Sequence, residues 1–395
     1  MTQEALFPAD IFREDLSLRN SALRYAREGI KYAGSKLKLL EAIFAITESI
    51  DHRTVVDFFS GTTRVGRLFA ALGSTVHSND ISLWSECFGK TYFLNEFESG
   101  HYEDLIDHLN HVKPVSGWFT ENYGGVDYDG SAIQPDGKKA LWQIQNTQLL
   151  DGIRDEIDRL ELDEVSKAVA LTSLIYALDS VDSTLGHFAA YLKQWSPRSY
   201  KTMRLKVPNL RPRQCRHTVS RQDANILAGE LNNSNTVVDL AYLDPPYGSN
   251  NEKMPPSRVR YSSYYHIWTT IVKNDQPDLF GAARRRIDTR DEFSVSKYEE
   301  FRRNENGTFI ALETLADLIM RIPAKHVLLS YSSGGRATFD QLLEVLGQSG
   351  EVVKVVQIDY KKNVMSTMRW TNEWVPNEVK KNYEYLFLLK KHDYN

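Results

Sequence analysis

The hydrophobic pattern of the N-terminal part of the chain alternates between helical and strand periodicity. Apolar residues recur at helical spacing in residues 36–50, and a continuous run of β-branched and aromatic residues follows at 54–59. Helical spacing returns at residues 65–72 and ends at Gly73, and a second strand pattern covers residues 75–78. Because a helix between two strands is the building unit of a parallel sheet, these residues predict an α/β fold.

The same alternation returns in the C-terminal part of the chain. Residues 237–243 form an apolar run that predicts a buried strand, and a long polar and aromatic stretch follows at 248–306. Three later elements are predicted, namely a helix at residues 309–320, a strand at 326–331 and a helix at 338–346. The last two strand patterns, residues 352–360 and 383–390, are separated by a loop, which predicts an antiparallel pair at the edge of the sheet.

The segment between these two parts has a different pattern. Helical stretches at residues 151–160 and 165–178 alternate with a loop rich in Gly and Asp, and strand patterns are scarce. We therefore expect one α/β domain formed by residues 1–83 and 219–395. A mainly helical insert, residues 84–218, interrupts this domain.

Composition narrows the class of protein. The chain has 395 residues, of which 42% are hydrophobic and 25% are charged, as in ordinary globular proteins. No apolar stretch is long enough to cross a bilayer, and residues 1–12 lack the pattern of an export signal. The two cysteines, Cys87 and Cys215, lie far apart and neither has metal-binding spacing. We therefore expect no disulfide framework, no metal site and a cytoplasmic location.

The strongest chemical signal is the tetrapeptide Asp244-Pro245-Pro246-Tyr247, which directly follows the predicted strand at 237–243. Open α/β sheets bind ligands at the carboxyl ends of their strands. The prolines fix φ and hold the carbonyl group of Pro245 in place, so that it and Asp244 can accept the two N–H groups of one amine. Tyr247 offers a flat face on which a base can stack. The alternative is a rigid turn without chemistry.

Such a site suits methyl transfer to an amine conjugated with an aromatic ring. The lone pair of the exocyclic N6 amine of adenine is delocalised, so acceptors that bind both N–H groups favour the sp³ geometry that attack requires. When a sulfonium donates its methyl group, the leaving group is a neutral thioether, so the reaction needs no metal. The residues therefore suit direct transfer between two bound reactants.

The tetrapeptide resembles the catalytic motif of amino-methyltransferases, in which Asp at the first position is typical of enzymes that methylate adenine N6 in DNA. Three other segments resemble the cofactor motifs of the Dam-like D12 class of adenine methylases, namely residues 30–36, 57–61 and 79–80. The order of cofactor motifs, insert and catalytic motif resembles the alpha arrangement, in which the insert is the target-recognition domain. The resemblance implies a Rossmann-like methyltransferase sheet, S-adenosylmethionine as the cofactor and double-stranded DNA as the substrate.

The same resemblance implies which residues bind the cofactor. They are Tyr32, Lys36, Asp57, Phe59, Gly61, Asp80, Asp223 and Asp244. Asp80 would accept the ribose hydroxyls, Lys36 would pair with the carboxylate of the cofactor, and Asp223 would accept its adenine amine. A solvated lysine and a helix cap remain the alternatives for Lys36 and Asp223. Thr63 departs from the family pattern, because a second Gly usually stands there and gives the loop freedom of φ.

A basic segment with interleaved aromatic residues predicts contact with phosphates. Residues 193–221 contain nine Lys or Arg and no acid, although the formal net charge of the chain is −4. The predicted DNA-binding residues are Lys193, Arg198, Lys201, Arg204, Lys206, Arg211 and Arg213. The alternative is a solvated basic loop without a DNA contact. A purely structural role is a stronger alternative for the second basic run, residues 284–286.

Taken together, these features predict a site-specific adenine-N6 DNA methyltransferase of a type II restriction–modification system. A cytosine-N4 or RNA methyltransferase of the same fold and a catalytically silent DNA-binding module remain open alternatives. A nicotinamide-dependent oxidoreductase is disfavoured because no GxGxxG follows the first strand. We expect a monomer that acts on DNA, with a cognate restriction endonuclease as a candidate partner.

Overall fold

The computed structural model describes residues 9–189, 192–248, 260–290, 296–360 and 382–392. The predicted absence of an export signal rests on residues 1–12, of which 1–8 lie outside the described residues. Part of the predicted polar stretch, residues 249–259 and 291–295, lies outside them as well. Within the described ranges, no helix combines the length and the apolar character needed to cross a membrane.

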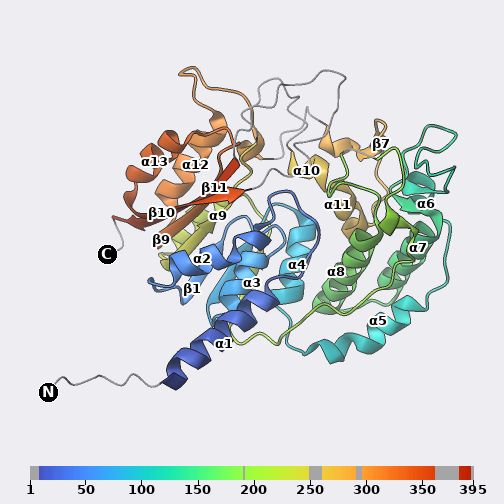
Figure 1. The fold of residues 1–395 in the computed structure, drawn as a ribbon, viewed down its shortest axis with the longest axis horizontal. Helices are drawn as coiled ribbons and strands as arrows, with labels where there is room; N and C mark the ends of the chain where they lie inside the picture. The colour runs from blue at the N-terminus through green and yellow to red at the C-terminus, as the bar shows by residue number, and fades with distance from the viewer. Residues whose placement is uncertain (1–8, 190–191, 249–259, 291–295, 361–381, 393–395) are drawn as a thin grey trace.

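A seven-stranded sheet forms the centre of the α/β part of the chain (Figure 1). Its strands are β1 (Thr54–Asp57), β2 (Thr75–Asn79), β5 (Thr218–Ser220), β6 (Val238–Leu243), β9 (Ala324–Ser332), β10 (Gly350–Tyr360) and β11 (Asn382–Lys391). They lie in the order β10-β11-β9-β6-β1-β2-β5. β11 is antiparallel to both of its neighbours, and the other pairings in this sheet are parallel. The predicted α/β class and its C-terminal antiparallel pair are thereby confirmed.

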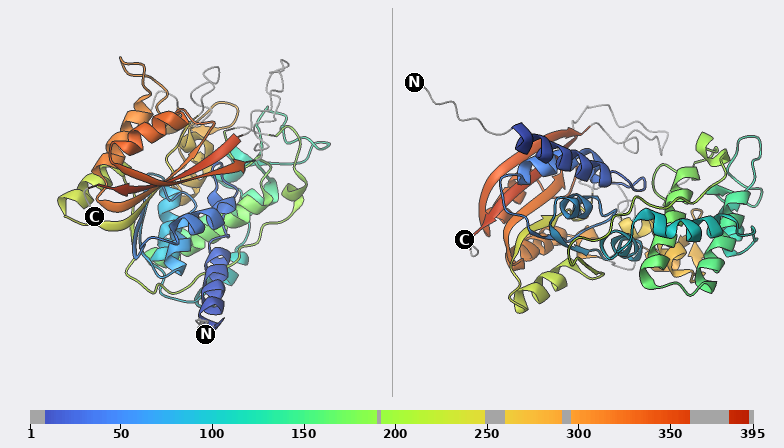
Figure 2. Two further views of the ribbon diagram at one scale, coloured as in Figure 1. Left: turned by 60° about the vertical axis from the view of Figure 1, so that its left-hand side comes forward. Right: turned by 90° about the horizontal axis from the view of Figure 1, so that it is seen from below.

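Helices cover both faces of the sheet (Figure 2). One face carries α1 (Ala9–Tyr25), α2 (Leu40–Thr47) and α3 (Arg64–Ala71), and the other carries α9 (Ala224–Asn233), α12 (Ile310–Arg321) and α13 (Phe339–Gly347). Side chains of a strand alternate between its faces. Accordingly Leu240 and Tyr242 pack with the first group of helices, whereas Ala241 and Leu243 pack with the second. We call this body the sheet module.

Most elements of residues 84–218 are helices, and they build most of a second core, while the predicted bounds of the insert stay a prediction. These helices are α4 (Leu83–Phe93), α5 (Glu103–Asn110), α6 (Trp118–Tyr123), α7 (Ile144–Arg159) and α8 (Glu164–Val181). α4 contacts β2 and β5 of the sheet as well as α8. Two helices from after the tetrapeptide, α10 (Tyr261–Tyr264) and α11 (His266–Lys273), also pack into this core through Tyr265, Ile267 and Trp268. We call α5 to α8 together with α10 and α11 the helical module.

Short elements complete the described chain. Four are two-residue strands, namely β3 (Gly124–Gly125), β4 (Trp142–Gln143), β7 (Leu279–Phe280) and β8 (Arg285–Arg286). The 3-10 helices are η1 (Lys36–Lys38), η2 (Ser99–Tyr102), η3 (Pro197–Tyr200), η5 (Ile287–Thr289) and η6 (Lys297–Glu299). The polar stretch predicted at 248–306 therefore holds several short elements, which periodicity did not indicate.

Candidate functional site

A pocket of about 260 Å³ lies where β1, β2 and β6 end. The residues predicted to bind a cofactor all line it, namely Tyr32, Lys36, Asp57, Phe59, Gly61, Asp80, Asp223 and Asp244. Pro246 of the tetrapeptide lines it too. The carboxyl ends of parallel strands meet at one edge of the sheet, and this brings together residues that are far apart in the chain.

The loop after β1 holds the carboxylate of Asp80 in a fixed position. The N–H of Gly61 donates to Asp80 Oδ2 at 2.8 Å, and the N–H of Ser82 donates to Oδ1 at the same distance. Gly61 has a φ of 47°, which Gly adopts without strain. Burial raises the pKa of Asp80 although these N–H groups lower it. Asp80 is therefore a preset acceptor at the wall of the pocket.

Thr63 adopts the backbone conformation that a Gly would favour. Its φ is 60°, its side chain is fully buried, and its carbonyl accepts the N–H of Arg67 in the first turn of α3. A β-branched residue in the left-handed region is strained by about 1 kcal/mol or more. The loop therefore keeps the left-handed backbone conformation that suits Gly, although a β-branched residue, Thr63, stands at this position.

This strain predicts that Gly stabilises the fold more than Ala does at position 63. We expect Thr63→Gly to be more stable than Thr63→Ala by about 1 kcal/mol, because both lose the buried hydroxyl and γ-methyl and only Gly, which has no Cβ, relieves the strain. The free energy of unfolding in urea measures the difference. Ala70→Gly within α3 is the control and should lose about 1 kcal/mol. Equal stability of the two variants at position 63 would contradict the strain.

Asp57 presents an unpaired oxygen at the wall of the pocket. Its Oδ2 accepts the N–H of Gly66 at 3.2 Å, whereas Oδ1 is buried and has no hydrogen-bond partner among the described residues. Burial raises the pKa of Asp57 well above its ordinary value, and the nearby Asp244 and Asp80 add to this. A buried carboxylate oxygen without a partner suits a ligand that brings an ammonium group or another donor.

Behind the tetrapeptide, a buried ammonium group lies between two carboxylates. Lys36 Nζ is 2.9 Å from Asp244 Oδ1 and 2.8 Å from Glu384 Oε1. It also donates to the hydroxyl of Tyr247 at 3.3 Å, and the hydroxyl of Ser330 donates to Glu384 Oε1 at 3.2 Å. The ammonium of Lys36 thus contacts two carboxylates of the chain itself. Its predicted pairing with the carboxylate of the cofactor stays a prediction.

The charges in this cluster shift one another. Burial raises the pKa of Asp244 to about 7, with Lys36 opposing the shift and Glu384 adding to it. Burial lowers the pKa of Lys36, but the two carboxylates outweigh it and the net pKa is raised well above the ordinary value. Lys36 is therefore charged at neutral pH, and Asp244 ionises around neutrality.

Tyr247 is held from two sides. Its ring lies 5.2 Å from the ring of Tyr331 between centroids, and its carbonyl accepts the N–H of Arg336 at 2.9 Å. Lys36 Nζ lies over the ring of Tyr247 at 5.3 Å. The ring therefore has a fixed orientation beside Asp244.

Aromatic residues around the predicted Tyr32, among them Trp84 and Tyr261 that were not predicted for the site, close the pocket toward the helical module. The ring of Tyr32 stacks on Tyr265 at 4.7 Å and lies 5.5 Å from Trp84 and 5.4 Å from Tyr261. Tyr261 and Trp84 also line the pocket. Three chain segments meet here, so periodicity within one segment could not reveal the wall.

At the opposite side, Asp223 has the role of a helix cap. Its Oδ1 accepts the N–H groups of Asn225 at 2.9 Å and Ile226 at 3.3 Å at the start of α9. Phe59 lies nearby with its ring 4.9 Å from Tyr298 in an edge arrangement. The predicted contact of Asp223 with the cofactor stays a prediction beside this observed capping role.

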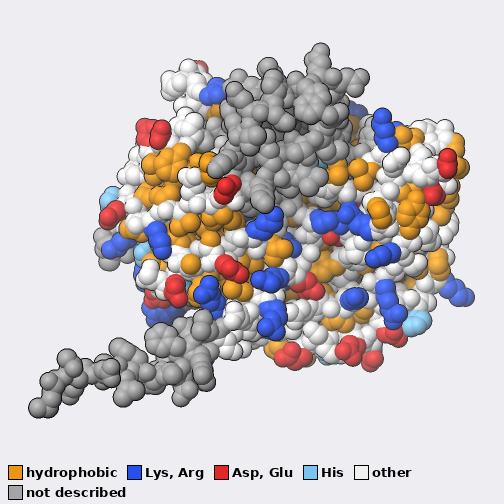
Figure 3. Space-filling view, in the orientation of Figure 1, with side chains coloured by type: hydrophobic (Ala, Val, Ile, Leu, Met, Phe, Trp, Pro, Cys, Tyr) orange, Lys and Arg blue, Asp and Glu red, His pale blue; other side chains and the backbone are white. Residues whose placement is uncertain are grey.

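The basic segment divides into exposed and engaged residues. Five of the predicted phosphate contacts are exposed, namely Lys193, Lys201, Arg204, Lys206 and Arg213. Arg198 pairs with the buried Asp182, Arg213 pairs with Glu96, and Arg211 lies 4.6 Å above the ring of Tyr25. Lys and Arg side chains recur across the middle of the face drawn in Figure 3. DNA contact by the seven residues stays a prediction, and Lys193, Lys201, Arg204 and Lys206 are exposed where they could make it.

The second basic run is bound within the helical module. Arg286 is buried, and its guanidinium pairs with Asp275 at 2.6 Å and Asp288 at 2.9 Å. Arg284 donates to Asn122 Oδ1 at 2.7 Å. This run therefore has a structural role. Across the described ranges, no group of three or more His, Cys, Asp or Glu is arranged to hold a metal ion.

Comparison with known proteins agrees with this geometry. The model of one family, the D12 class N6 adenine-specific DNA methyltransferases, matches residues 32–306. Modification methylase LlaI of Lactococcus lactis subsp. lactis is 28% identical over 378 residues, which cover 92% of this chain and 55% of the relative. Modification methylase StsI of Streptococcus sanguinis is 24% identical over 371 residues, which cover 92% and 52%.

A further relative is comparable in length. Type II methyltransferase M.NlaIII of Neisseria lactamica is 24% identical over 371 residues, which cover 92% of this chain and 99% of the relative. The chain thus spans about half the length of LlaI and StsI and nearly all of M.NlaIII. The matched family region contains the pocket residues from Tyr32 to Glu299.

Proposed function

The chain belongs to the D12 class N6 adenine-specific DNA methyltransferases, and from this premise we propose that it transfers a methyl group from S-adenosylmethionine to N6 of adenine in double-stranded DNA. The observation that carries the proposal is the position of Asp244. Its carboxylate lies at the end of β6 in the same pocket as Asp57 and Asp80. An acceptor for the amine thus adjoins a site for a cationic cofactor.

The residues of the pocket fit S-adenosylmethionine. The unpaired Oδ1 of Asp57 suits the α-ammonium group, and the preset carboxylate of Asp80 suits the ribose hydroxyls. Phe59 offers an aromatic face beside Asp223 for the adenine ring. When bound, S-adenosylmethionine supplies an electrophilic methyl group on a sulfonium.

The chain itself contributes acceptors and orientation. The target adenine leaves the duplex and stacks on Tyr247, whose ring is fixed by Lys36 and Tyr331. The carboxylate of Asp244 and the carbonyl of Pro245 accept the N6 hydrogens and stabilise the positive charge that develops on nitrogen. Because burial raises the pKa of Asp244 to about 7, its ionised form gains population as the pH rises above neutrality.

DNA recognition falls to the helical module in this proposal. The exposed side chains of Lys193, Lys201, Arg204 and Lys206 contact phosphates, and the helices of residues 84–218, joined by α10 and α11, present side chains to the bases. We place the enzyme in a type II restriction–modification system, acting as a monomer in the cytoplasm. Its candidate partner is a cognate endonuclease.

Product analysis tests the proposed function. The purified chain is incubated with methyl-labelled S-adenosylmethionine and unmethylated genomic DNA, and the modified nucleosides are identified by mass spectrometry. We expect N6-methyladenine, and a parallel reaction with RNA should stay unlabelled. N4-methylcytosine would overturn the assignment of the base. Absence of label from the DNA of several genomes would overturn the activity.

A further inference from the structure

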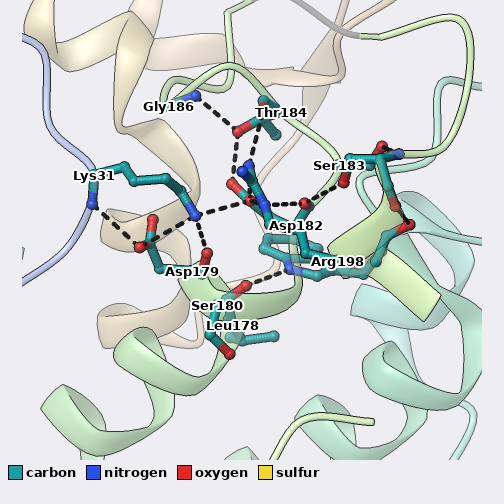
Figure 4. Close-up of polar contacts among 12 residues, drawn as sticks. Lys31, Leu178, Asp179, Ser180, Asp182, Ser183, Thr184, Gly186 and Arg198 are labelled. Carbon is teal, nitrogen blue, oxygen red and sulfur yellow. Dashed lines mark hydrogen bonds and ion pairs between the residues drawn. The ribbon is translucent and has the colours of Figure 1, made fainter. Parts of the chain in front are cut away.

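A cluster of four charged side chains joins the helical module to the loop that carries Tyr32 (Figure 4). Lys31 belongs to this loop, Asp179 and Asp182 lie at the end of α8, and Arg198 lies in η3. Lys31 Nζ is 3.1 Å from Asp182 Oδ1 and 3.3 Å from Asp179 Oδ2. Two bases and two acids meet here, so the cluster carries no net charge.

Asp182 is the centre of this cluster. Its side chain is 1% exposed, whereas that of Lys31 is 36% exposed. Its Oδ1 accepts Arg198 Nε at 2.8 Å as well as Arg198 Nη2, and its Oδ2 accepts the hydroxyl of Thr184 at 2.6 Å. The carbonyl of the same residue accepts Arg198 Nε at 2.8 Å. A carboxylate this deeply buried depends on both of its cationic partners.

The loop on the pocket side is tied on both sides of Tyr32. The N–H of Lys31 donates to Asp179 Oδ2 at 3.1 Å, and its ammonium group donates to the carbonyl of Asp179. The N–H of Ala33 donates to the hydroxyl of Tyr265 at 2.6 Å. Tyr32 lies between these two anchors, and its ring lines the pocket. The position of this ring is therefore set by the helical module.

On the other side, Arg198 anchors the basic segment. Arg198 lies in η3 between the exposed residues Lys193 and Lys201, and its Nη2 also donates to the carbonyl of Thr184 at 2.7 Å. Downstream of η3, Arg204 and Lys206 point outward while Met203 and Leu205 are buried. The side chains of Asn146 and Asn110 hold the backbone of Met203 and Leu205 in this stretch, and Arg198 holds its start.

We propose that Asp182 is a positioning residue that connects the cofactor pocket with the basic segment that contacts DNA. Through Lys31 it holds Tyr32 in the wall of the cofactor pocket, and through Arg198 it holds the basic segment in place for the phosphates of DNA. The proposal rests on the proposed function, because the cofactor and the DNA are those of that function. Asp182 makes no contact with the tetrapeptide at residues 244–247. Its effect therefore falls on binding rather than on the chemical step.

Three single variants separate the two arms of the cluster. Lys31→Met removes the ammonium contacts of the loop but keeps the backbone hydrogen bond from Lys31 to Asp179. Arg198→Met removes the guanidinium contacts of the basic segment, and Asp182→Asn removes the charge between the two arms. Lys31→Arg tests rescue by a conservative change. Lys167→Met is the matched control, because Lys167 pairs with Asp158 at 2.8 Å in an exposed ion pair within the helical module.

Two measurements are made on the full chain. Calorimetry gives the Kd for S-adenosylhomocysteine, the product form of the cofactor, and labelled transfer to unmethylated plasmid DNA gives KM and kcat. We expect Lys31→Met to raise the Kd about tenfold, or about 1.4 kcal/mol, and to leave the KM for DNA within about twofold. Arg198→Met should show the reverse pattern, and Lys31→Arg should recover most of the affinity.

Asp182→Asn decides the proposal. We expect it to raise both the Kd for S-adenosylhomocysteine and the KM for DNA about tenfold, with kcat within about threefold of wild type. Because this variant keeps the charge of Arg198, a higher KM for DNA reports lost positioning rather than a lost phosphate contact. The salt dependence of DNA binding should accordingly keep its slope.

Three outcomes would overturn the proposal. One is an Asp182→Asn variant with both constants equal to those of Lys167→Met, and another is a fall in melting temperature without a change in either constant. Should Asp182→Asn not fold, equal constants for wild type, Lys31→Met and Arg198→Met decide against it in the same way. If wild type binds S-adenosylhomocysteine but methylates no DNA, the proposed function fails while the Lys31→Met comparison still tests the cofactor arm.

Discussion

Asp244→Asn is expected to lower kcat for adenine methylation by about 10³-fold at pH 8, while the chain stays folded. The amide can still accept one hydrogen bond, but it carries no charge to stabilise the positive nitrogen of the transition state. Burial already raises the pKa of Asp244 to about 7, so a neutral side chain removes a charge that the fold disfavours. Initial rates with labelled S-adenosylmethionine measure kcat, and urea unfolding measures stability.

A second carboxylate on the same strand provides the matched control. Asp239 lies near the start of β6, pairs with Lys325 at 2.7 Å and accepts the N–H of Thr54 at 3.0 Å. Burial alone would raise the pKa of Asp239, but Lys325 and Thr54 bring it below its ordinary value. Asp239→Asn should therefore cost about 1–2 kcal/mol of stability and leave kcat within about twofold. A kcat of Asp244→Asn within tenfold of wild type would refute the catalytic role of this residue.

The pocket was predictable because its residues follow strands with clear patterns. Asp57 is the last residue of β1, Asp80 and Asp244 directly follow β2 and β6, and parallel strands bring their carboxyl ends to one edge. The tetrapeptide adds a specific chemical signature to the last of these positions. Local sequence and topology thus agree, and the eight predicted pocket residues meet in space.

Glu384 escaped prediction although it completes the ion cluster. It lies in β11, and its contact with Lys36 joins residues 348 positions apart. Only the register of β11 against β9, which pairs Glu384 with Ser332, brings the side chain behind the tetrapeptide. One local signal exists, because an acid within the apolar strand Asn382–Lys391 is unusual where both sheet faces are covered.

The second core of the molecule depends on contacts that no local pattern encodes. α10 has four residues and α11 has eight, which is too short for a clear helical period. Trp268 of α11 and Tyr265, which lies between the two helices, nevertheless pack with α4 and α8 in this second core. The same reason explains Arg198, whose charge is visible in the sequence while its buried partner Asp182 is not.

Lys36→Met is expected to destabilise the fold by about 3–5 kcal/mol, because it leaves two buried carboxylates without their shared cation. Lys36 is 6% exposed and lies within 3 Å of Asp244 and Glu384, at 2.9 and 2.8 Å. The repulsion between the two acids should further raise the pKa of Asp244, so activity at pH 8 should also fall. Urea unfolding at pH 8 gives the free energy, and labelled transfer gives the rate.

The double variant Lys36→Met with Glu384→Gln shows whether charge is the cause. Removing the second acid should return about half or more of the lost stability, since only one buried carboxylate then remains. A double variant no more stable than Lys36→Met would assign the loss to packing of the lysine stem instead. Activity should stay low in the double variant, because Asp244 still lacks the cation that favours its ionised form. Stability that returns without activity would mean that the ammonium of Lys36 serves the fold through its contact with Glu384 and the ionisation of Asp244 through its contact with Asp244.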